Sequence, residues 1–274
     1  MTIEARVIAH SVAEGSPPLA TLQLRYPRMI HSEFMTHRAF SRNASSSRAV
    51  PVARMIEDVA NDMAEPVEWG ANRPGMQAGE PLRGHELAEA RWAWRQAGRY
   101  ALMQARMLAE AGVHKQIVNR VLEPFAHISV VVTATEWDNF FALRCHPDAD
   151  PTMRALAEAM REALGDSKPV EIGPCDWHLP YVTIKERHQG NINDLLRYSA
   201  ARCARVSYLR HDGATPSHQD DLALFARLNG EVLHASPMEH QANPTANHRR
   251  HEKNLRGWMQ FRAVVEHDRA RVAL

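Results

Sequence analysis

The feature that most constrains the fold is the run HISVVVTAT at residues 127–135, the most β-branched stretch of the chain. β-branched side chains pack well on a pleated surface, so we expect this run to form a buried strand. Residues 3–9 and 19–25 alternate apolar and polar side chains and predict two more strands, joined by a turn that contains Gly15, Pro17 and Pro18. The chain is therefore expected to contain a sheet.

Helical segments follow and separate these predicted strands. We expect a short helix after Pro27 and further helices at residues 52–64, 85–112, 113–123, 136–144, 150–164, 192–204 and 218–234. Residues 38–51 and 65–83 predict loops, and residues 165–195 predict an irregular segment with a strand at residues 181–184. Together these elements predict an α+β (mixed α/β) fold. No linker divides the chain, so we expect a single domain over residues 1–274.

The charge balance limits the ligands that the chain can bind. Its 33 basic and 32 acidic residues give a formal net charge of +1, which excludes a bulk polycation that binds nucleic acid through its overall field. Of the 33 cations, 29 are arginine. The planar guanidinium fork binds phosphate and carboxylate bidentately, which suits a local nucleotide site, although a GC-rich genome would produce the same bias.

The cysteines and the apolar segments indicate the compartment. Cys145, Cys175 and Cys203 have no C-x-x-C spacing, which argues against a disulfide framework and against a four-cysteine zinc site. No segment approaches the ~20 apolar residues of a membrane span, and the start of the chain has no apolar signal region. We therefore expect a cytoplasmic protein with no membrane contact. The His and Asp residues at 146–150 predict a solvated turn rather than a metal site.

The densest polar cluster spans residues 36–48, where a predicted helix gives way to a loop. Three guanidiniums, an imidazole, an amide and several hydroxyls fall within thirteen residues, and they could donate hydrogen bonds to a phosphorylated ligand. A solvated, serine-rich loop with capping residues is the alternative interpretation of this composition.

The spacing within this cluster resembles the signature R-H-R-x-x-S-x-N-E-x-S-x-R-Y of the flavin-dependent thymidylate synthases. Six positions stand in register, namely His37, Arg38, Ser41, Asn43, Ser46 and Arg48. Thr36, Ala44 and Ala49 replace the family's Arg, Glu and Tyr, and upstream Glu33 stands where many members have Gln. Two downstream segments also resemble the family: residues 112–122 are similar to G-V-x-x-E-x-A-R-x-V-L-P, and residues 139–144 are similar to N-F-L-x-L-R.

A third match lies at an unexpected place in the chain. Residues 203–208 and 234–240 are similar to the family's A-R-V-S-Y and H-x-S-x-x-E-H elements, which precede the R-H-R segment in the family but follow it here. We interpret this order as a circular permutation, in which residues 1–164 carry the flavin and nucleotide segment and residues 192–274 carry the permuted segment. The hypothesis predicts that His240 lies near the strand at Thr21.

The resemblance implies a ThyX-type domain with a mixed or antiparallel sheet and long helices. It also implies an enzyme that methylates dUMP at C5, with FAD as cofactor and with methylenetetrahydrofolate and NAD(P)H as co-substrates. The family's active sites lie between the subunits of a homotetramer, so we expect an oligomer here as well.

The resemblance also implies a role for each matched residue. The residues implied to bind the flavin are His37, Arg38, Ser41, Asn43, Asn139 and His240. Those implied to bind the substrate are Glu33, Ser46, Arg48, Asn119 and Arg144, and those implied in catalysis are Ser46, Arg48, Arg144, His234 and Glu239. Ser46 is expected to contact phosphate rather than to act as a nucleophile, because no general base stands beside it. Arg38 and Glu239 are expected on opposite sides of one isoalloxazine.

Departures from the family pattern leave the substrate open. Asn119 stands where the family has an arginine that contacts the nucleotide, and Thr36 and Ala44 remove a cation and a carboxylate. A related flavoenzyme that modifies another pyrimidine nucleotide is therefore a second hypothesis. A non-catalytic nucleic-acid-binding protein that uses the basic run at residues 248–251 is a third, which the near-neutral charge disfavours.

Overall fold

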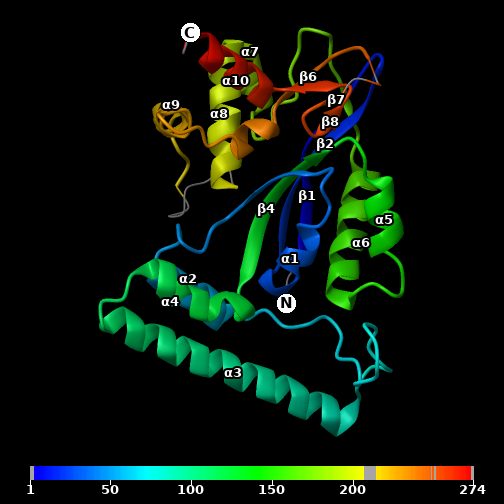
Figure 1. Ribbon diagram of the computed structural model, residues 1–274, viewed down its shortest axis with the longest axis vertical. Helices are drawn as coiled ribbons and strands as arrows, with labels where there is room; N and C mark the ends of the chain where they lie inside the picture. The colour runs from blue at the N-terminus through cyan, green and yellow to red at the C-terminus, as the bar shows by residue number, and fades with distance from the viewer. Residues whose placement is uncertain (1–2, 207–213, 248, 250, 273–274) are drawn as a thin grey trace.

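A five-stranded mixed sheet forms the centre of the computed structural model, which describes residues 3–206, 214–247, 249 and 251–272 (Figure 1). The strand order is β3-β4-β2-β1-β5, with β1 (Glu4–Ala13), β2 (Ser16–Pro27), β3 (Ser41–Ala44), β4 (His127–Ala134) and β5 (Val170–Glu171). The first four strands pair antiparallel, and β5 runs parallel to β1. The predicted fold class and the three predicted strands are confirmed.

The hairpin between β1 and β2 is tighter than the sequence predicted. Pairing continues to Ala13 and Ser16, so Pro17 and Pro18 lie inside β2 rather than in the turn. Gly15 makes the turn with φ +68°, a left-handed conformation that glycine adopts without steric cost. A Cβ at this position would lie 2.8 Å from the carbonyl oxygen of Ala246, so the turn also needs glycine to fit against the C-terminal part of the chain.

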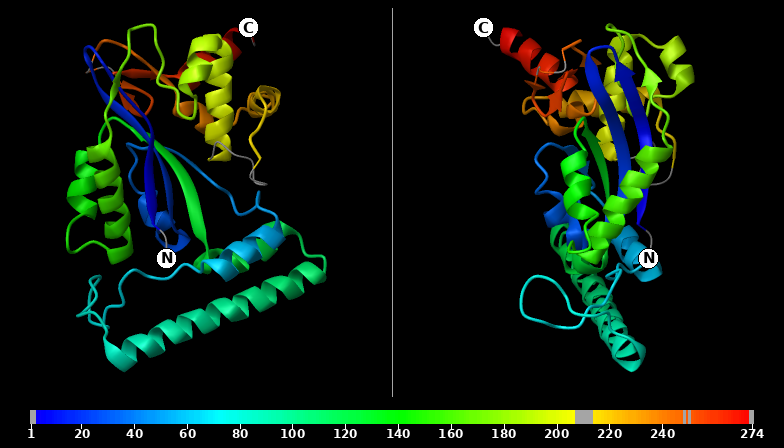
Figure 2. Two further views of the ribbon diagram at one scale, coloured as in Figure 1. Left: turned by 180° about the vertical axis from the view of Figure 1, so that it is seen from behind. Right: turned by 90° about the vertical axis from the view of Figure 1, so that its right-hand side faces the viewer.

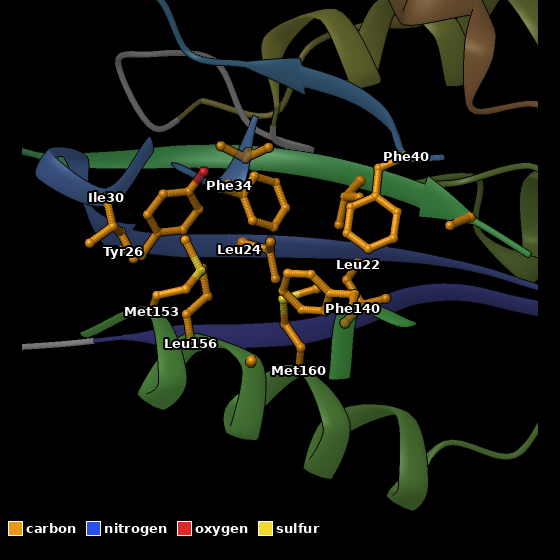
Figure 3. Close-up of a cluster of buried hydrophobic side chains, with 14 of the residues drawn as sticks. Leu22, Leu24, Tyr26, Ile30, Phe34, Phe40, Phe140, Met153, Leu156 and Met160 are labelled. Carbon is orange, nitrogen blue, oxygen red and sulfur yellow. The ribbon is translucent and has the colours of Figure 1, made fainter. Parts of the chain in front are cut away.

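The main hydrophobic core lies on one face of the sheet. Leu22, Leu24 and Tyr26 point to this face because side chains alternate along a strand. They pack against η1 (Arg28–Ile30), α1 (His31–Phe34), α5 (Asp138–Arg144) and α6 (Pro151–Asp166). Figure 3 shows Met153, Leu156 and Met160 of α6 reaching toward these strands and the ring of Phe140 in the same cluster. The other face leaves Gln23 and Arg25 outside this core.

A helical layer lies beyond one end of the sheet. It contains α2 (Val52–Asn61), α3 (Gly84–Glu110) and α4 (Lys115–Leu122), which the sequence periodicity predicted, and the short η2 (Glu123–Phe125), which it did not. α3 packs on α2 and α4 through one side only, and Figures 1 and 2 show it as a long bar at the edge of the molecule. Its outer side exposes Trp92 (65%) and Tyr100 (64%) together with Met103 and Met107.

The elements from residue 184 to residue 272 form a second helical group at the end of the sheet opposite α3. Its elements are α7 (Ile184–Gln189), α8 (Ile192–Arg205), α9 (His218–Leu228), η3 (Ser236–Glu239), β6 (Ala242–Pro244), β7 (His251–Glu252), β8 (Leu255–Arg256), β9 (Trp258–Gln260) and α10 (Phe261–Val272). The strand predicted at residues 181–184 is wrong, because Tyr181 has φ +62° and α7 begins at Ile184. The helix predicted to reach residue 234 ends at Leu228.

Buried ion pairs hold this helical group together. Arg202, with a side chain 1% exposed, bonds to Glu186 of α7 and to Asp221 of α9. Burial by itself would raise the pKa of Glu186, but hydrogen bonds from Arg202 and Thr183 outweigh it and hold the pKa at about 2. The Arg202 guanidinium therefore compensates part of the charge of two carboxylates that could not be buried alone, and Arg205 is a second partner for Asp221.

A chain of buried hydrogen bonds joins the C-terminal half to the sheet. His178 bonds to Ser11 and Thr21, each at 2.8 Å, Thr21 bonds to Thr133 at 2.7 Å, and Thr133 bonds to Nδ1 of His240 at 2.8 Å. All five side chains are buried. The prediction that His240 lies near Thr21 is confirmed.

β3 replaces part of the loop that the sequence predicted for residues 38–51. It pairs with β4 from Ser41 opposite Thr133 to Ala44 opposite Val130. The fully buried hydroxyl of Ser41 accepts a hydrogen bond of 2.8 Å from Gln260, at the far end of the chain. The strand thus depends on a distant partner, which local composition does not reveal.

Across the described residues, no helix combines the length and the apolar composition needed to cross a bilayer. Ser207 and Tyr208 of the third motif match, and His248 and Arg250 of the basic run, lie outside the described residues.

Candidate functional site

Arg144, at the end of α5, is the centre of one cluster of predicted site residues. Its Nε donates to Nε2 of His37 at 3.0 Å, a terminal nitrogen bonds to the carboxylate of Glu33, and the other reaches Thr36 at 3.4 Å. Burial lowers the pKa of His37, and the neighbouring guanidiniums of Arg144 and Arg42 lower it further. His37 is therefore neutral near pH 7, so its Nε2 can accept the Arg144 hydrogen bond.

A cavity of about 570 Å³ opens beside this cluster. Glu33 and Arg144 line it together with Arg73, Arg154 and Asp150, among other residues. The carboxylate of Asp150 caps the N-terminus of α6, which is a structural role. The structure thus joins Arg144 to Glu33 and His37, with 111 positions between Glu33 and Arg144. These contacts fix the Arg144 guanidinium at the wall of the cavity, where solvent can reach it.

A second group of predicted residues lines a smaller cavity of about 200 Å³. Asn43 and Ser46 of the first motif face His234 and Ser236 of the third motif across it. The amide of Asn43 donates to the carbonyl oxygens of Cys203 at 2.8 Å and Ala204 at 3.3 Å, and it accepts from Ser236 at 3.0 Å. Two segments almost two hundred positions apart are therefore joined at one surface.

The loop that carries Ser46 and Arg48 is fixed from below by Asn119. This amide is fully buried and donates to the carbonyl oxygens of Ser47 at 2.7 Å and Val50 at 2.9 Å. Asn119 therefore does not reach the surface where a nucleotide would bind, contrary to the expected substrate contact. Ser46 and Arg48 are exposed, and the hydroxyl of Ser46 accepts from the backbone N–H of Arg48 at 3.3 Å.

Three other predicted site residues also lie in the interior. Ser41 and His240 are fully buried, and Glu239 is 8% exposed and paired with Arg262 at 2.6 Å. The expected direct contacts of Ser41 and His240 with a flavin do not fit this placement, because each side chain is enclosed by protein. They hold β3 and η3 in position instead.

Arg38 and Asn139 are exposed, and they lie outside the cavities described above. The expected arrangement of Arg38 and Glu239 around one flavin ring is not formed within a single chain, because Arg38 faces solvent while Glu239 is buried against Arg262. Any ring held between them would need a rearrangement or a surface from another chain.

Two arginines beside the site had no predicted role. Arg42 donates to the carbonyl oxygens of Met35 at 2.8 Å and Phe34 at 3.4 Å and so anchors the end of α1. Arg205 lines the smaller cavity and bonds to Asp221. Arg205 belongs to the A-R-V-S-Y match, so the motif did contain a signal for its importance.

The sequence profile of the family described as thymidylate synthase complementing protein matches residues 9–170 of this chain. The match covers more than half of the chain, which therefore belongs to this family, and the resemblance to the ThyX enzymes is confirmed. Among curated protein sequences, none matches the chain significantly.

Two solved structures align with parts of this chain. The UMP/dUMP methylase PolB from Streptomyces cacaoi, bound with 5-Br dUMP, aligns with a TM-score of 0.50 at 15% identity, covering 60% of this chain and 90% of that chain. ThyX from Helicobacter pylori with FAD and dUMP aligns with a TM-score of 0.38 at 18% identity, covering 53% and 67%. At 15% identity, the likeness to PolB shows the fold alone.

Proposed function

We propose that this protein is an FAD-dependent enzyme that reductively methylates dUMP at C5, with methylenetetrahydrofolate as carbon donor and NAD(P)H as reductant. Membership of the thymidylate synthase complementing protein family supports this activity. The observation that carries the proposal is the cavity in which Asn43 and Ser46 of the first motif meet His234 of the third. We place the enzyme in the cytoplasm, since its three cysteines are free thiols.

The donors at this cavity fit the phosphate groups of FAD. The hydroxyl of Ser46 and the guanidinium of Arg205 line this cavity and could donate to a phosphate, whereas the amide of Asn43 and the hydroxyl of Ser236 are already hydrogen-bonded and shape its wall. Arg38 and Asn139 are exposed and His37 is half-buried. The cavity volume of about 200 Å³ is below the ~300–1,000 Å³ of whole small-molecule sites, so the cavity would hold one part of the dinucleotide. When bound, the flavin supplies the electrons of the reduction.

The nucleotide would be held by two groups of residues. Ser46 and Arg48 would contact its phosphate, and Arg144 would donate to a pyrimidine carbonyl and polarise the ring at C5. Glu33 and His37 fix the Arg144 guanidinium before substrate binds, so little reorganisation is needed when charge develops. His234 would lie near the flavin, and Glu239 would act through Arg262 and η3 rather than by direct contact.

These two groups lie on different parts of one chain, which supports an active site completed by a second copy in a homotetramer. The outer side of α3 exposes Trp92, Tyr100, Met103 and Met107, which recur along one side of a helix of 27 residues. Contiguous exposed apolar patches of this kind mark protein contacts. We propose this side of α3 as a contact between copies.

The absorbance spectrum of the protein as isolated, and after addition of FAD, tests the flavin part of the proposal. We expect a flavin band that changes on addition of dUMP. Colourless protein that fails to bind added FAD would contradict it. The mass of the product from dUMP, methylenetetrahydrofolate and NADPH then tests the reaction, and dTMP is the expected product.

One observation favours a second candidate, a related flavoenzyme that modifies another pyrimidine nucleotide. The side chain of Asn119 is buried and bonded to Ser47 and Val50. It therefore cannot make the nucleotide contact that the family's arginine makes at this position. A nucleotide with other polar groups would fit such a site. Turnover of a different pyrimidine nucleotide, with no turnover of dUMP, would support this alternative.

A further inference from the structure

A second polar cavity, of about 390 Å³, lies on the face of the sheet opposite the main core. We call it the α2 cavity, because α2 forms one wall with Arg54 and Asp58, while β2 and β4 form the floor with Gln23, Arg25, His127 and Ser129. None of these side chains was assigned a role above. Arg205 and Ser45 line both the α2 cavity and the smaller cavity at Asn43 and Ser46, so the two are neighbours across this pair.

Unpartnered nitrogens point to a ligand in the α2 cavity. The side chain of His127 is 4% exposed, and neither of its ring nitrogens has a partner at hydrogen-bond distance among the described residues; Nδ1 lies 3.7 Å from the carboxylate of Asp62. Nε of Arg205 is also buried without a partner, although the side chain is 12% exposed and a terminal nitrogen bonds to Asp221. Buried polar groups in native proteins are almost always hydrogen-bonded, so three such atoms around one cavity need an occupant.

The charges around the α2 cavity favour an anion. Three guanidiniums, those of Arg25, Arg54 and Arg205, line it against the single carboxylate of Asp58. Asp62 and Asp221 lie behind the wall and hold Arg25 and Arg205 in place, and Arg54 pairs with Asp58 at 2.9 Å. The cationic excess at the lining surface matches a phosphate monoester, which carries about −1.5 to −2 charges near neutral pH.

The imidazole of His127 suits the same ligand. Burial lowers its pKa to about 4, with a further lowering by Arg25 that the nearby Asp62 carboxylate opposes. The ring is therefore neutral near pH 7 and offers one donor and one acceptor. An oxyanion can accept from the donor, and a hydroxyl of the same ligand can donate to the other nitrogen. A bare ion would leave the second nitrogen unpaired, and the volume also exceeds that of a bare ion.

We propose that the α2 cavity binds a small phosphorylated metabolite, with His127 and Nε of Arg205 contacting its phosphate and Arg25 and Arg54 neutralising its charge. The site does not depend on the methylation proposed above. The α2 cavity adjoins the cavity at Asn43 and Ser46. Its ligand is therefore either a separate metabolite or one part of a longer ligand that fills both cavities and passes Arg205. Both sources share the phosphate chemistry.

Binding to the full-length protein, measured by calorimetry, tests the proposal with inorganic phosphate, ribose 5-phosphate, dUMP and FAD as separate probes. The substitution His127→Phe removes both ring nitrogens and, inside the protein, only the 3.7 Å contact of Nδ1 with Asp62, so we expect the variant to fold and to bind phosphate about tenfold to a hundredfold more weakly. His85→Phe, at an imidazole whose side chain is 81% exposed, is the matched control and should bind as the unmodified protein does.

Arg54→Gln provides a second variant whose folding is not in doubt, because this side chain is 57% exposed. We expect it to weaken phosphate binding as well. Loss of inorganic phosphate and ribose 5-phosphate binding, with FAD binding retained, would identify a separate metabolite. Parallel loss of FAD binding would identify a phosphate of the flavin as the ligand. Absence of binding by all four probes, or equal binding by both variants and the unmodified protein, would overturn the proposal, whereas failure of dUMP methylation alone would not.

Discussion

His240 should make the stability of this protein depend on pH in a way that one substitution can remove. Its ring is fully buried, Nδ1 bonds to Thr133 at 2.8 Å, and Nε2 has no partner among the described residues. Burial lowers its pKa from 6.5 to about 3. Below pH 6.5 the unfolded chain takes up a proton at His240 that the folded chain does not. The free energy of unfolding therefore keeps its full value above pH 6.5 and decreases as the pH falls toward 3.

The size of this effect follows from the linkage of protons to unfolding. One proton taken up only by the unfolded chain costs about 1.4 kcal/mol of unfolding free energy per pH unit, which amounts to roughly 2 kcal/mol between pH 6.5 and about pH 5. The substitution His240→Asn keeps a group able to bond Thr133 but removes the titrating ring. Between pH 6.5 and about pH 5, we expect the unfolding free energy of the variant to fall by roughly 2 kcal/mol less than that of the unmodified protein.

Urea unfolding followed by circular dichroism at several pH values measures this difference. His146→Asn is the control, since it makes the same substitution at a side chain that is 59% exposed and lies just after α5. Equal losses for His240→Asn and the unmodified protein would refute the reasoning, because they would show that the folded state accommodates a charged ring at this position.

Three further predictions concern other parts of the structure. Arg202→Met should destabilise the fold by about 3–5 kcal/mol, because Glu186 and Asp221 both lose a buried cationic partner and, within the described part of the chain, only Asp221 keeps a second arginine, Arg205. Thermal unfolding measures this loss, and the more exposed Arg197→Met should change the melting temperature little. Asn119→Ala should destabilise the fold by about 1–3 kcal/mol, because the carbonyl oxygens of Ser47 and Val50 lose their donor. It should also speed proteolysis at residues 45–50, and an unchanged cleavage rate would contradict this role. If copies of the chain meet through α3 as proposed, Trp92→Glu combined with Tyr100→Glu should reduce the mass measured by light scattering without changing the melting temperature. An unchanged mass would exclude this side of α3 as the contact.

Local sequence patterns were sufficient for the elements that are stabilised by their own neighbours. The β-branched run predicted β4, and the helical period predicted α3 within one or two residues. β3 was not predictable, because Ser41 and Asn43 are paired with residues 160 to 219 positions away. Tyr181 was predicted in a strand for a similar reason. Its left-handed backbone is fixed by Arg202, which bonds to its carbonyl oxygen at 2.7 Å.

The same distinction applies to the candidate site. Motif register identified Glu33, His37 and Arg144, and the structure brings them into contact. Register could not show which matched side chains face solvent, because burial depends on the elements that pack above them. Ser41 and His240 are enclosed for that reason. The α2 cavity was missed altogether, since its walls come from β2, β4, α2 and α8 and correspond to no single motif.

The buried contacts between the two ends of the chain also govern how a ribosome can produce this protein. Thr21 and Thr133 are synthesised before their partners His178 and His240. Ser41 can accept its hydrogen bond only after Gln260, the residue before α10, has been synthesised. Contacts so distant in sequence form slowly, because a long loop must close first. The buried polar groups of the nascent sheet therefore stay open to water until His178 and His240 have been synthesised, and β3 lacks its side-chain partner until Gln260 has followed.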